Sequence, residues 1–118
     1  PRMKLPLVDV RDVAKMHVSA LKTDESIGKR FILSENEYWM IDIASRLNSL
    51  GYDAPKKEAP NFLMKIIAIF DQSMKITLPF LGLDYNLNTE QARQVLGFKP
   101  ISNEQTLKDS VTYVKSLM

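Results

Sequence analysis

Histidine and cysteine, two residue types that often catalyse reactions or bind metals, are scarce in this sequence. The only histidine, His17, falls among apolar residues at helical spacing, and cysteine is absent. We expect a packed or hydrogen-bonded structural role for His17. Without cysteine, disulfides, thiolate catalysis and cysteine-ligated zinc are excluded. No clustered carboxylates and no Gly-x-Ser-x-Gly segment offer another metal or nucleophile site. The sequence therefore predicts no catalytic residue and no metal site in this chain.

The glycines lack the spacing that phosphate binding requires. Gly28, Gly51, Gly82 and Gly97 stand far apart. A Gly-x-Gly-x-x-Gly or Walker loop needs several glycines close together, so that backbone N–H groups can surround a phosphate. Each glycine is instead expected to form a turn or to end a helix. The sequence therefore predicts no cofactor-binding residue in this chain.

The composition is that of one globular domain. The chain has 118 residues, of which 45% are hydrophobic and 25% charged, and its net charge of +2 comes from scattered side chains. Scattered basic residues argue against a nucleic-acid partner. The longest apolar stretch, residues 62–70, contains Lys65 and is too short to cross a bilayer, so no membrane partner is expected. The absence of cysteine fits a cytoplasmic protein. We expect residues 1–118 to form a single domain.

The first motif joins a strand to a helix. Apolar residues predict a strand over residues 3–10, and the helix that follows ends near Lys22. Asp9 is expected to be the N-cap of this helix, and Asp12 complements the positive end of its dipole. Arg11 is expected at the surface or at an interface between domains.

Further elements follow from the spacing of apolar residues and caps. A second strand is predicted over residues 30–33, with a turn over residues 34–38. Four further helices are predicted over residues 39–50, 62–75, 88–96 and 102–117. Gly51 is placed to end the first of these in a left-handed conformation. Asn61 is placed to cap the second, and Asn88 and Ser102 open capping boxes for the last two. The predicted fold class is α+β and mostly helical, with about five helices and two short strands.

Several motifs occur in an order that resembles one family. These are residues 8–14 (Val-Asp-Val-Arg-Asp-Val-Ala), 28–34 (Gly-Lys-Arg-Phe-Ile-Leu-Ser), 88–93 (Asn-Thr-Glu-Gln-Ala-Arg) and 96–100 (Leu-Gly-Phe-Lys-Pro). The sequence resembles the C-terminal portion of extended short-chain dehydrogenases/reductases, in the NAD-dependent epimerase/dehydratase superfamily. Within it, the chain is most similar to the dihydroflavonol-reductase-like and aldehyde-reductase-like branch. The resemblance implies a fragment of a Rossmann-type reductase that transfers a hydride from NADPH or NADH to a ketone or aldehyde.

The chain departs from that family in ways that define what it can do. The glycine-rich loop and the catalytic Tyr-x-x-x-Lys pair of the family are absent. Tyr52 and Lys56 have the spacing but lie in a loop with prolines, whereas the family's pair lies on a long helix. The resemblance thus implies that the cofactor domain and the catalytic residues lie outside this chain. We expect the fragment alone to be inactive and to bind neither NADP nor NAD.

The resemblance implies that this chain supplies the substrate-binding side of the reductase. No basic residue occurs between Lys75 and Arg93, so a small apolar carbonyl substrate is favoured over a nucleotide sugar. The expected wall of an apolar substrate pocket, with core packing as its competing interpretation, consists of Phe62, Ile66, Phe70, Pro79, Phe80 and Tyr85. Expected partners are the missing Rossmann domain and a second copy bound through the apolar helix over residues 62–75. The alternatives are a free-standing helical binding or dimerisation module and a fragment of a nucleotide-sugar epimerase or dehydratase.

Overall fold

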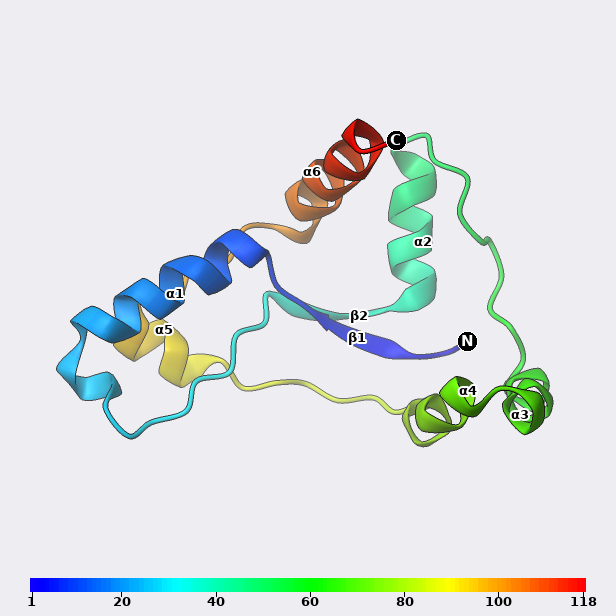
Figure 1. Cartoon of the computed structure of the whole chain (residues 1–118), viewed down its shortest axis with the longest axis horizontal. Helices are drawn as coiled ribbons and strands as arrows, with labels where there is room; N and C mark the ends of the chain where they lie inside the picture. Colours follow the sequence, from blue (N-terminus) through cyan, green and yellow to red (C-terminus); the bar gives the residue numbers. More distant parts are fainter. The chain divides into compact units, whose positions relative to one another are not determined.

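The computed structural model describes all 118 residues and contains six α-helices, two 3₁₀ turns and a two-stranded sheet (Figure 1). The predicted mostly helical α+β architecture is confirmed, with six helices in place of about five. The chain divides into two compact units, Pro1–Leu5 with Tyr38–Tyr85 and Pro6–Glu37 with Asn86–Met118. None of the helices combines the length and the apolar character that crossing a membrane would need.

The first unit contains three helices and a 3₁₀ turn. They are α2 (Met40–Ser49), α3 (Asn61–Phe70), α4 (Gln72–Thr77) and η2 (Leu78–Phe80). α3 packs against α4 and η2. Met64 and Ala68, four residues apart on one face of α3, are the fully buried apolar side chains of this unit. Most of the apolar surface of α3 therefore remains exposed.

The helix predicted over residues 62–75 is broken in two at Asp71. This residue has extended backbone, with φ −122° and ψ 109°, and its side chain accepts a hydrogen bond of 2.8 Å from Ser73 N–H. Asp71 thus ends α3 and caps α4. At the start of α3 the N-cap is Pro60 and not Asn61, which is the first helical residue. The apolar pattern predicted the helical content but not the break.

Helix α2 ends just before the glycine that the sequence predicted as its stop. Gly51 has φ +88°, and Tyr52 N–H donates to Leu47 O at 3.0 Å. The predicted left-handed glycine after this helix is therefore confirmed. The Asn48 side chain holds the following loop, because it donates to Ala54 O and accepts from Ala54 N–H, both at 3.1 Å.

The second unit contains three helices and the other 3₁₀ turn. They are α1 (Val10–Lys22), η1 (Asp24–Ser26), α5 (Glu90–Leu96) and α6 (Asn103–Ser116). α1 and η1 pack against α5. The fully buried apolar side chains are Ala92, Leu96 and Phe98. The short helix α5 and the residue just after its glycine cap therefore supply the core of this unit.

The helix starts at Asp9 and Ser102 are confirmed. Asp9 accepts from Arg11 N–H at 2.9 Å as the N-cap of α1. Ser102 accepts from Gln105 N–H at 3.4 Å as the N-cap of α6. In both cases a side-chain oxygen satisfies a backbone donor that has no partner within the helix.

The two ends of α5 differ in how well the sequence predicted them. Gly97 has φ +69° and ends the helix, as expected. At the start, the N-cap is Thr89 and not Asn88, although the Asn88 side chain accepts from Glu90 N–H at 2.9 Å. Asn88, the predicted N-cap, therefore makes a capping hydrogen bond but lies one residue before the observed N-cap.

The sheet pairs β1 (Lys4–Leu7) with β2 (Asn36–Trp39). Glu35 N–H donates to Leu7 O at 2.7 Å, and Met40 N–H donates to Met3 O at 2.9 Å. The residue numbers rise on one strand as they fall on the other, so the pair is antiparallel.

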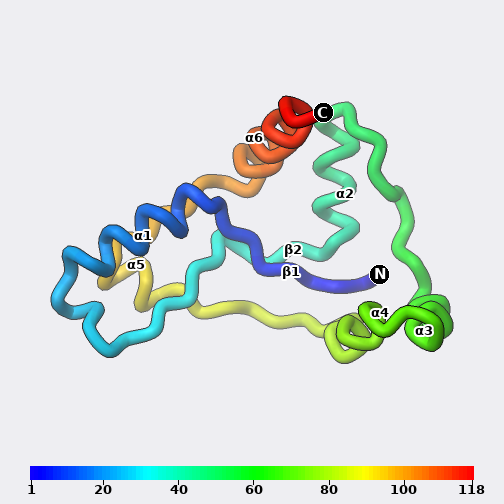
Figure 2. The backbone as a smooth tube through the Cα atoms, in the orientation of Figure 1, coloured from blue at the N-terminus to red at the C-terminus, as the bar shows by residue number.

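Both strand predictions need correction. The first strand is shorter than residues 3–10, because Asp9 and Val10 begin α1. No strand forms over residues 30–33, and β2 instead covers residues 36–38 of the predicted turn and Trp39, which was predicted to begin the next helix. The backbone of residues 30–33 makes no hydrogen bond to another backbone group, and a strand exists only where a neighbour pairs with it. Figure 2 follows the backbone through this stretch, between α1 and β2.

Candidate functional site

A cavity of about 320 Å³ in the first unit is the candidate site. It is lined by Met3, Lys4, Leu5, Ile76, Thr77, Phe80 and Tyr85. The lining combines hydrocarbon side chains with a few polar groups, which is the usual composition of a small-molecule pocket. The residues come from β1 and the segment before it, from α4, from η2 and from the loop that follows η2.

Backbone contacts hold that loop against the start of the chain. Gly82 N–H donates to Arg2 O at 2.7 Å, and Met3 forms an antiparallel bridge with Leu81. The Tyr85 hydroxyl donates to Lys4 O at 3.0 Å. The wall formed by Tyr85 is therefore fixed by a long-range hydrogen bond and does not depend on local helix formation.

The polar groups of the cavity are already engaged with the protein. Thr77 Oγ1 donates to Met74 O at 2.8 Å, and Lys4 Nζ forms a 2.5 Å ion pair with Asp84. With the Tyr85 proton also donated to the backbone, both hydroxyls offer a ligand only acceptor oxygens. The cavity is therefore suited to hold apolar parts of a small molecule and supplies no free hydroxyl donor.

The structure brings together two of the six residues expected to line a substrate pocket. Phe80 and Tyr85 line the cavity. Phe62 and Phe70 lie on α3 with 65% and 88% of their surface exposed, and Ile66 is also exposed. The remaining expected residue, Pro79, is exposed in η2. None of these six side chains is in the core.

The sequence reasoning missed the other residues of the cavity. Ile76 and Thr77 follow the predicted helix over residues 62–75, in a segment expected to face substrate but without being named as wall residues, and Met3 and Leu5 belong to the first predicted strand. The only local signal was the apolar character of residues 76–83. The contact between these two distant segments depends on tertiary structure.

A second cavity of about 240 Å³ in the same unit runs along α2. It is lined mainly by α2 side chains, with Pro55, Lys57 and Glu58 from the loop after that helix among the others. Glu58 forms a long ion pair of 3.7 Å with Arg2. None of the residues expected to contact substrate lies in this cavity.

His17 makes a hydrogen bond within its own helix. Its Nδ1 lies 2.8 Å from Val13 O, and because a carbonyl only accepts, Nδ1 carries the proton. The hydrogen-bonded role expected for His17 is therefore present, although the side chain is exposed and not packed in the core. No group of three or more histidine, aspartate and glutamate side chains gathers as a metal site would require.

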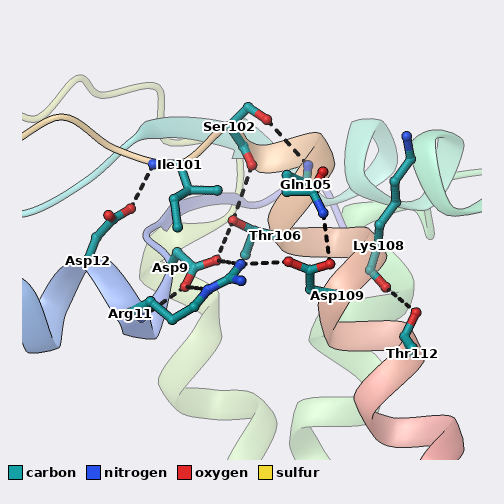
Figure 3. Close-up of polar contacts among 10 residues, drawn as sticks. All are labelled: Asp9, Arg11, Asp12, Ile101, Ser102, Gln105, Thr106, Lys108, Asp109 and Thr112. Carbon is teal, nitrogen blue, oxygen red and sulfur yellow. Dashed lines mark hydrogen bonds and ion pairs between the residues drawn. The ribbon is translucent and has the colours of Figure 1, made fainter.

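The main ionic cluster of the second unit centres on Asp9 (Figure 3). This side chain is 4% exposed. It accepts from Arg11 Nε at 2.9 Å and Nη2 at 2.7 Å, and from Thr106 Oγ1 at 2.9 Å. Arg11 Nη2 also donates to Asp109 at 2.7 Å. These contacts tie the start of α1 to α6.

The cluster changes the ionisation of its members in a direction that stabilises the fold. The side-chain hydrogen bond from Arg11 holds the pKa of Asp9 well below its usual range, with smaller help from the backbone of Arg11 and from Thr106. The pKa of Arg11 is raised, first by Asp9 and then by Asp109. Arg11 was expected at the surface or at a domain interface, and its half-exposed side chain makes these contacts inside its own unit. We interpret the cluster as structural.

Comparison with known proteins shows that this chain is similar to part of certain reductases. No family model matches the sequence. Over 97% of its length, the chain is 28% identical to the NADPH-dependent methylglyoxal reductase GRE2 of Saccharomyces cerevisiae, and the match covers 32% of that protein. It is 29% identical over 91% of its length to a putative NADPH-dependent methylglyoxal reductase, GRP2, of Candida albicans, covering 28% of that protein. The chain thus spans about a third of the length of the curated relatives it matches.

Solved structures agree with the sequence matches. The crystal structure of the yeast methylglyoxal/isovaleraldehyde reductase Gre2 complexed with NADPH superposes with a TM-score of 0.69 and 26% identity, covering 98% of this chain and 34% of that one. The structure of gox2253 superposes with a TM-score of 0.75 at 18% identity, covering 98% of this chain and 38% of that one, which shows a shared fold. The predicted resemblance to a Rossmann-type, NAD(P)-dependent reductase is confirmed.

Proposed function

We propose that residues 1–118, which are similar in sequence to about one third of NADPH-dependent methylglyoxal reductases, form the substrate-side portion of an NADPH-dependent reductase of small aldehydes and ketones. The observation that carries the proposal is the alignment of nearly the whole chain with one third of such enzymes. The cavity bounded by Phe80 and Tyr85 supports it, because it offers a concave apolar surface to a small molecule.

The residues of this chain do not fit NADPH. All four glycines have positive φ, yet each stands alone at a turn or a helix end, so no loop of adjacent backbone N–H groups forms to hold a pyrophosphate. We assign cofactor binding and hydride transfer to the part of the reductase outside this chain. The chain alone is then inactive and binds neither NADP nor NAD.

The cavity residues would orient the substrate because they offer it hydrocarbon surface but no free hydroxyl donor. Ile76 and Phe80 supply hydrocarbon surface for the apolar substituent of an aldehyde or ketone. The hydroxyl groups of Thr77 and Tyr85 donate their hydrogen bonds to backbone carbonyls. A carbonyl oxygen needs a donor, so it is directed away from this wall, toward donors in the rest of the reductase. A cavity of this composition favours a carbonyl compound with one apolar substituent over a sugar nucleotide.

The remaining expected wall residues would act together with the rest of the reductase. Phe62, Ile66 and Phe70 of α3 and Pro79 of η2 are exposed in this chain. We propose that the missing part covers them and that they complete an apolar enclosure around the substrate. Their exposure is what an incomplete pocket would produce.

The test replaces the matching third of the S. cerevisiae reductase with this chain. We expect the joined protein to oxidise NADPH in the presence of methylglyoxal. Phe80→Ala should raise KM on the order of 10-fold, because it removes an apolar contact worth about 1–2 kcal/mol. Tyr113→Ala, a change at an exposed position of α6, is the matched control and should leave KM unchanged.

Two results would contradict this proposal. A joined protein that binds NADPH but reduces no small aldehyde or ketone would show that the chain does not supply the substrate side. Saturable micromolar binding of NADPH to the 118-residue chain by itself would show that the cofactor site is not confined to the rest of the reductase.

A second candidate function is a binding or dimerisation module, and the exposed apolar side chains of α3 favour it. Ile69 and Phe70 are among the most exposed large apolar side chains of the chain. Exposed apolar patches of this kind mark interaction surfaces. Sedimentation of the 118-residue chain over a range of concentrations tests this function, since a module that dimerises doubles its mass.

A further inference from the structure

We propose that the cavity bounded by Phe80 and Tyr85 binds a carboxylate at Lys4, and that the substrate is therefore a short oxo acid. Such a compound carries its carbonyl group at one end, a carboxylate at the other and a few methylene groups between them. The inference rests on the proposed function, because it names the substrate class of the same cavity.

Lys4 is the one charged residue in the lining of this cavity. Its side chain is only 11% exposed. The Tyr85 hydroxyl donates to its carbonyl oxygen at 3.0 Å, which holds the Lys4 backbone beside Tyr85. An ammonium group with so little access to water requires a negative charge close to it.

Asp84 supplies that negative charge from the protein surface. Its Oδ1 atom lies 2.5 Å from Lys4 Nζ, although the Asp84 side chain is 70% exposed. Asp84 can turn into water at little cost in free energy, because ion pairs with an exposed partner are weak. A ligand carboxylate that enters the cavity can therefore replace Asp84 and keep the ammonium paired.

A second cation near Lys4 also favours an anion at this end of the cavity. Arg2 Cζ and Lys4 Nζ lie 4.6 Å and 5.7 Å from the centroid of the same Trp39 ring. Arg2 makes a long ion pair of 3.7 Å with Glu58. Two cations that share one ring repel each other, and an added negative charge offsets this repulsion.

The rest of the lining indicates what the carboxylate is attached to. Ile76 and Phe80 offer hydrocarbon surface to methylene groups. The hydroxyls of Thr77 and Tyr85 already donate to backbone carbonyls. The carbonyl oxygen of the substrate finds no hydroxyl donor here, so it lies at the end of the molecule that points out of the cavity. The class that fits is an aliphatic aldehyde or ketone with a carboxylate at its far end.

The joined S. cerevisiae protein described above tests the substrate class. The comparison is between 4-oxobutanoate and butanal, which has the same carbon chain without the carboxylate. We expect kcat/KM to be higher for 4-oxobutanoate on the order of 10-fold, because an ammonium–carboxylate hydrogen bond is added. Lys4→Met should abolish this preference, since methionine keeps an unbranched side chain without the charge. Asp84→Asn should increase it, since it removes the carboxylate that competes for Lys4.

The opposite effects of the two variants separate recognition from a structural role. Lys108→Met removes the cation of an exposed ion pair in α6, and as the matched control it should leave the preference unchanged. If the pair of Lys4 and Asp84 only stabilises the fold, neither of its variants changes the preference. No preference for 4-oxobutanoate, or the same preference in the Lys4→Met and Asp84→Asn proteins, would overturn the inference. Reduction of butanal in that case would leave the proposed function intact.

Binding to the 118-residue chain tests the carboxylate site without the rest of the reductase. At constant ionic strength, butanoate should shift the backbone amide NMR signals of Leu5, Phe80 and Tyr85 at concentrations about 10-fold lower than 1-butanol requires. Lys4→Met should remove this difference, and equal affinities of the unmodified chain for the two probes would overturn the inference. A joined protein that binds NADPH but reduces neither 4-oxobutanoate nor butanal would reject the substrate-side function. Butanoate binding to the chain would then still support Lys4 as a carboxylate site.

Discussion

Asp9 shows how one side chain can join several parts of the chain. The sequence predicted Asp9 only as an N-cap, from its position before a helical pattern. The structure adds the Arg11 side chain and Thr106, which lies 97 residues further on. A cap can be predicted from sequence because it is a local contact, whereas the hydrogen bond from Thr106 to Asp9 forms only when the chain folds.

The ionisation of Asp9 gives the first prediction. Its pKa is lower in the folded chain than its ordinary value of 3.8, chiefly because of the hydrogen bond from the Arg11 side chain. Below that ordinary value the unfolded chain binds the proton more readily than the folded chain. The free energy of unfolding is therefore greatest above about pH 4 and should fall as the pH decreases toward the folded pKa.

Urea unfolding at several acidic pH values measures this dependence. Asp9→Asn should flatten the decline, because it removes the group whose pKa differs between the two states. Asp109→Asn is the matched control, since it removes the other partner of Arg11 and leaves the donors on Asp9 in place. An Asp9→Asn protein with an undiminished acid dependence would contradict the assignment.

Asn103 gives the second prediction at this scale. The residue is 3% exposed, and its buried side-chain oxygen and nitrogen both lack a hydrogen-bond partner. Burying an unpaired amide costs about 1–3 kcal/mol, so Asn103→Leu should raise the free energy of unfolding by about 1 kcal/mol or more. Chemical denaturation measures the change. Asn103→Ala is the control that removes the amide without filling its volume, and a loss of stability in both variants would contradict the prediction.

At the scale of elements, the helix ends depend on single residues with special backbone conformations. The third prediction concerns Gly97, which has φ +69° after α5 and no neighbouring atom within 4 Å of the position of an added Cβ. Gly97→Ala should lower the free energy of unfolding by about 1 kcal/mol, because only the backbone conformation penalises it. Gly97→Asn should cost less, since asparagine tolerates the left-handed region. Equal losses in the two variants, measured by urea unfolding, would argue against this origin.

The elements also show where local pattern fails as a guide. The predicted helix over residues 62–75 has continuous apolar spacing, but Asp71 satisfies Ser73 N–H better as a cap than as a helical residue. The predicted strand over residues 30–33 has the right residue types, but no neighbouring segment of this chain pairs with its backbone. In the first case a local hydrogen bond overrides the periodicity. In the second, strand formation is a property of two segments and not of one.

At the scale of the whole molecule, the chain exposes more large apolar side chains than it buries. The fourth prediction follows from the α3 surface. Ile69→Lys combined with Phe70→Lys should leave helicity and the melting temperature nearly unchanged, because both side chains are exposed, and should reduce self-association at high concentration. Sedimentation and circular dichroism measure the two effects. Met64→Lys is the buried counterpart on the same helix and should unfold the unit.

A negative result for association would also be informative. If the unmodified chain sediments as a monomer at all concentrations, the exposed surface of α3 does not bind a second copy, and the dimerisation module is rejected. The proposal for the substrate side would be unaffected, since it assigns the covering of this surface to the rest of the reductase.

The sequence by itself determined the features that local interactions control. These are the mostly helical content, the caps at Asp9 and Ser102, the glycine stops at Gly51 and Gly97, and the resemblance to an NAD(P)-dependent reductase. A helix end is fixed by residues within four positions of each other, so its signal survives in any piece of chain. Only the tertiary structure decided that Phe80 and Tyr85 share a cavity with Met3 and Leu5, and that residues 30–33 stay unpaired. Both outcomes depend on contacts between distant segments, whose presence or absence no local pattern encodes.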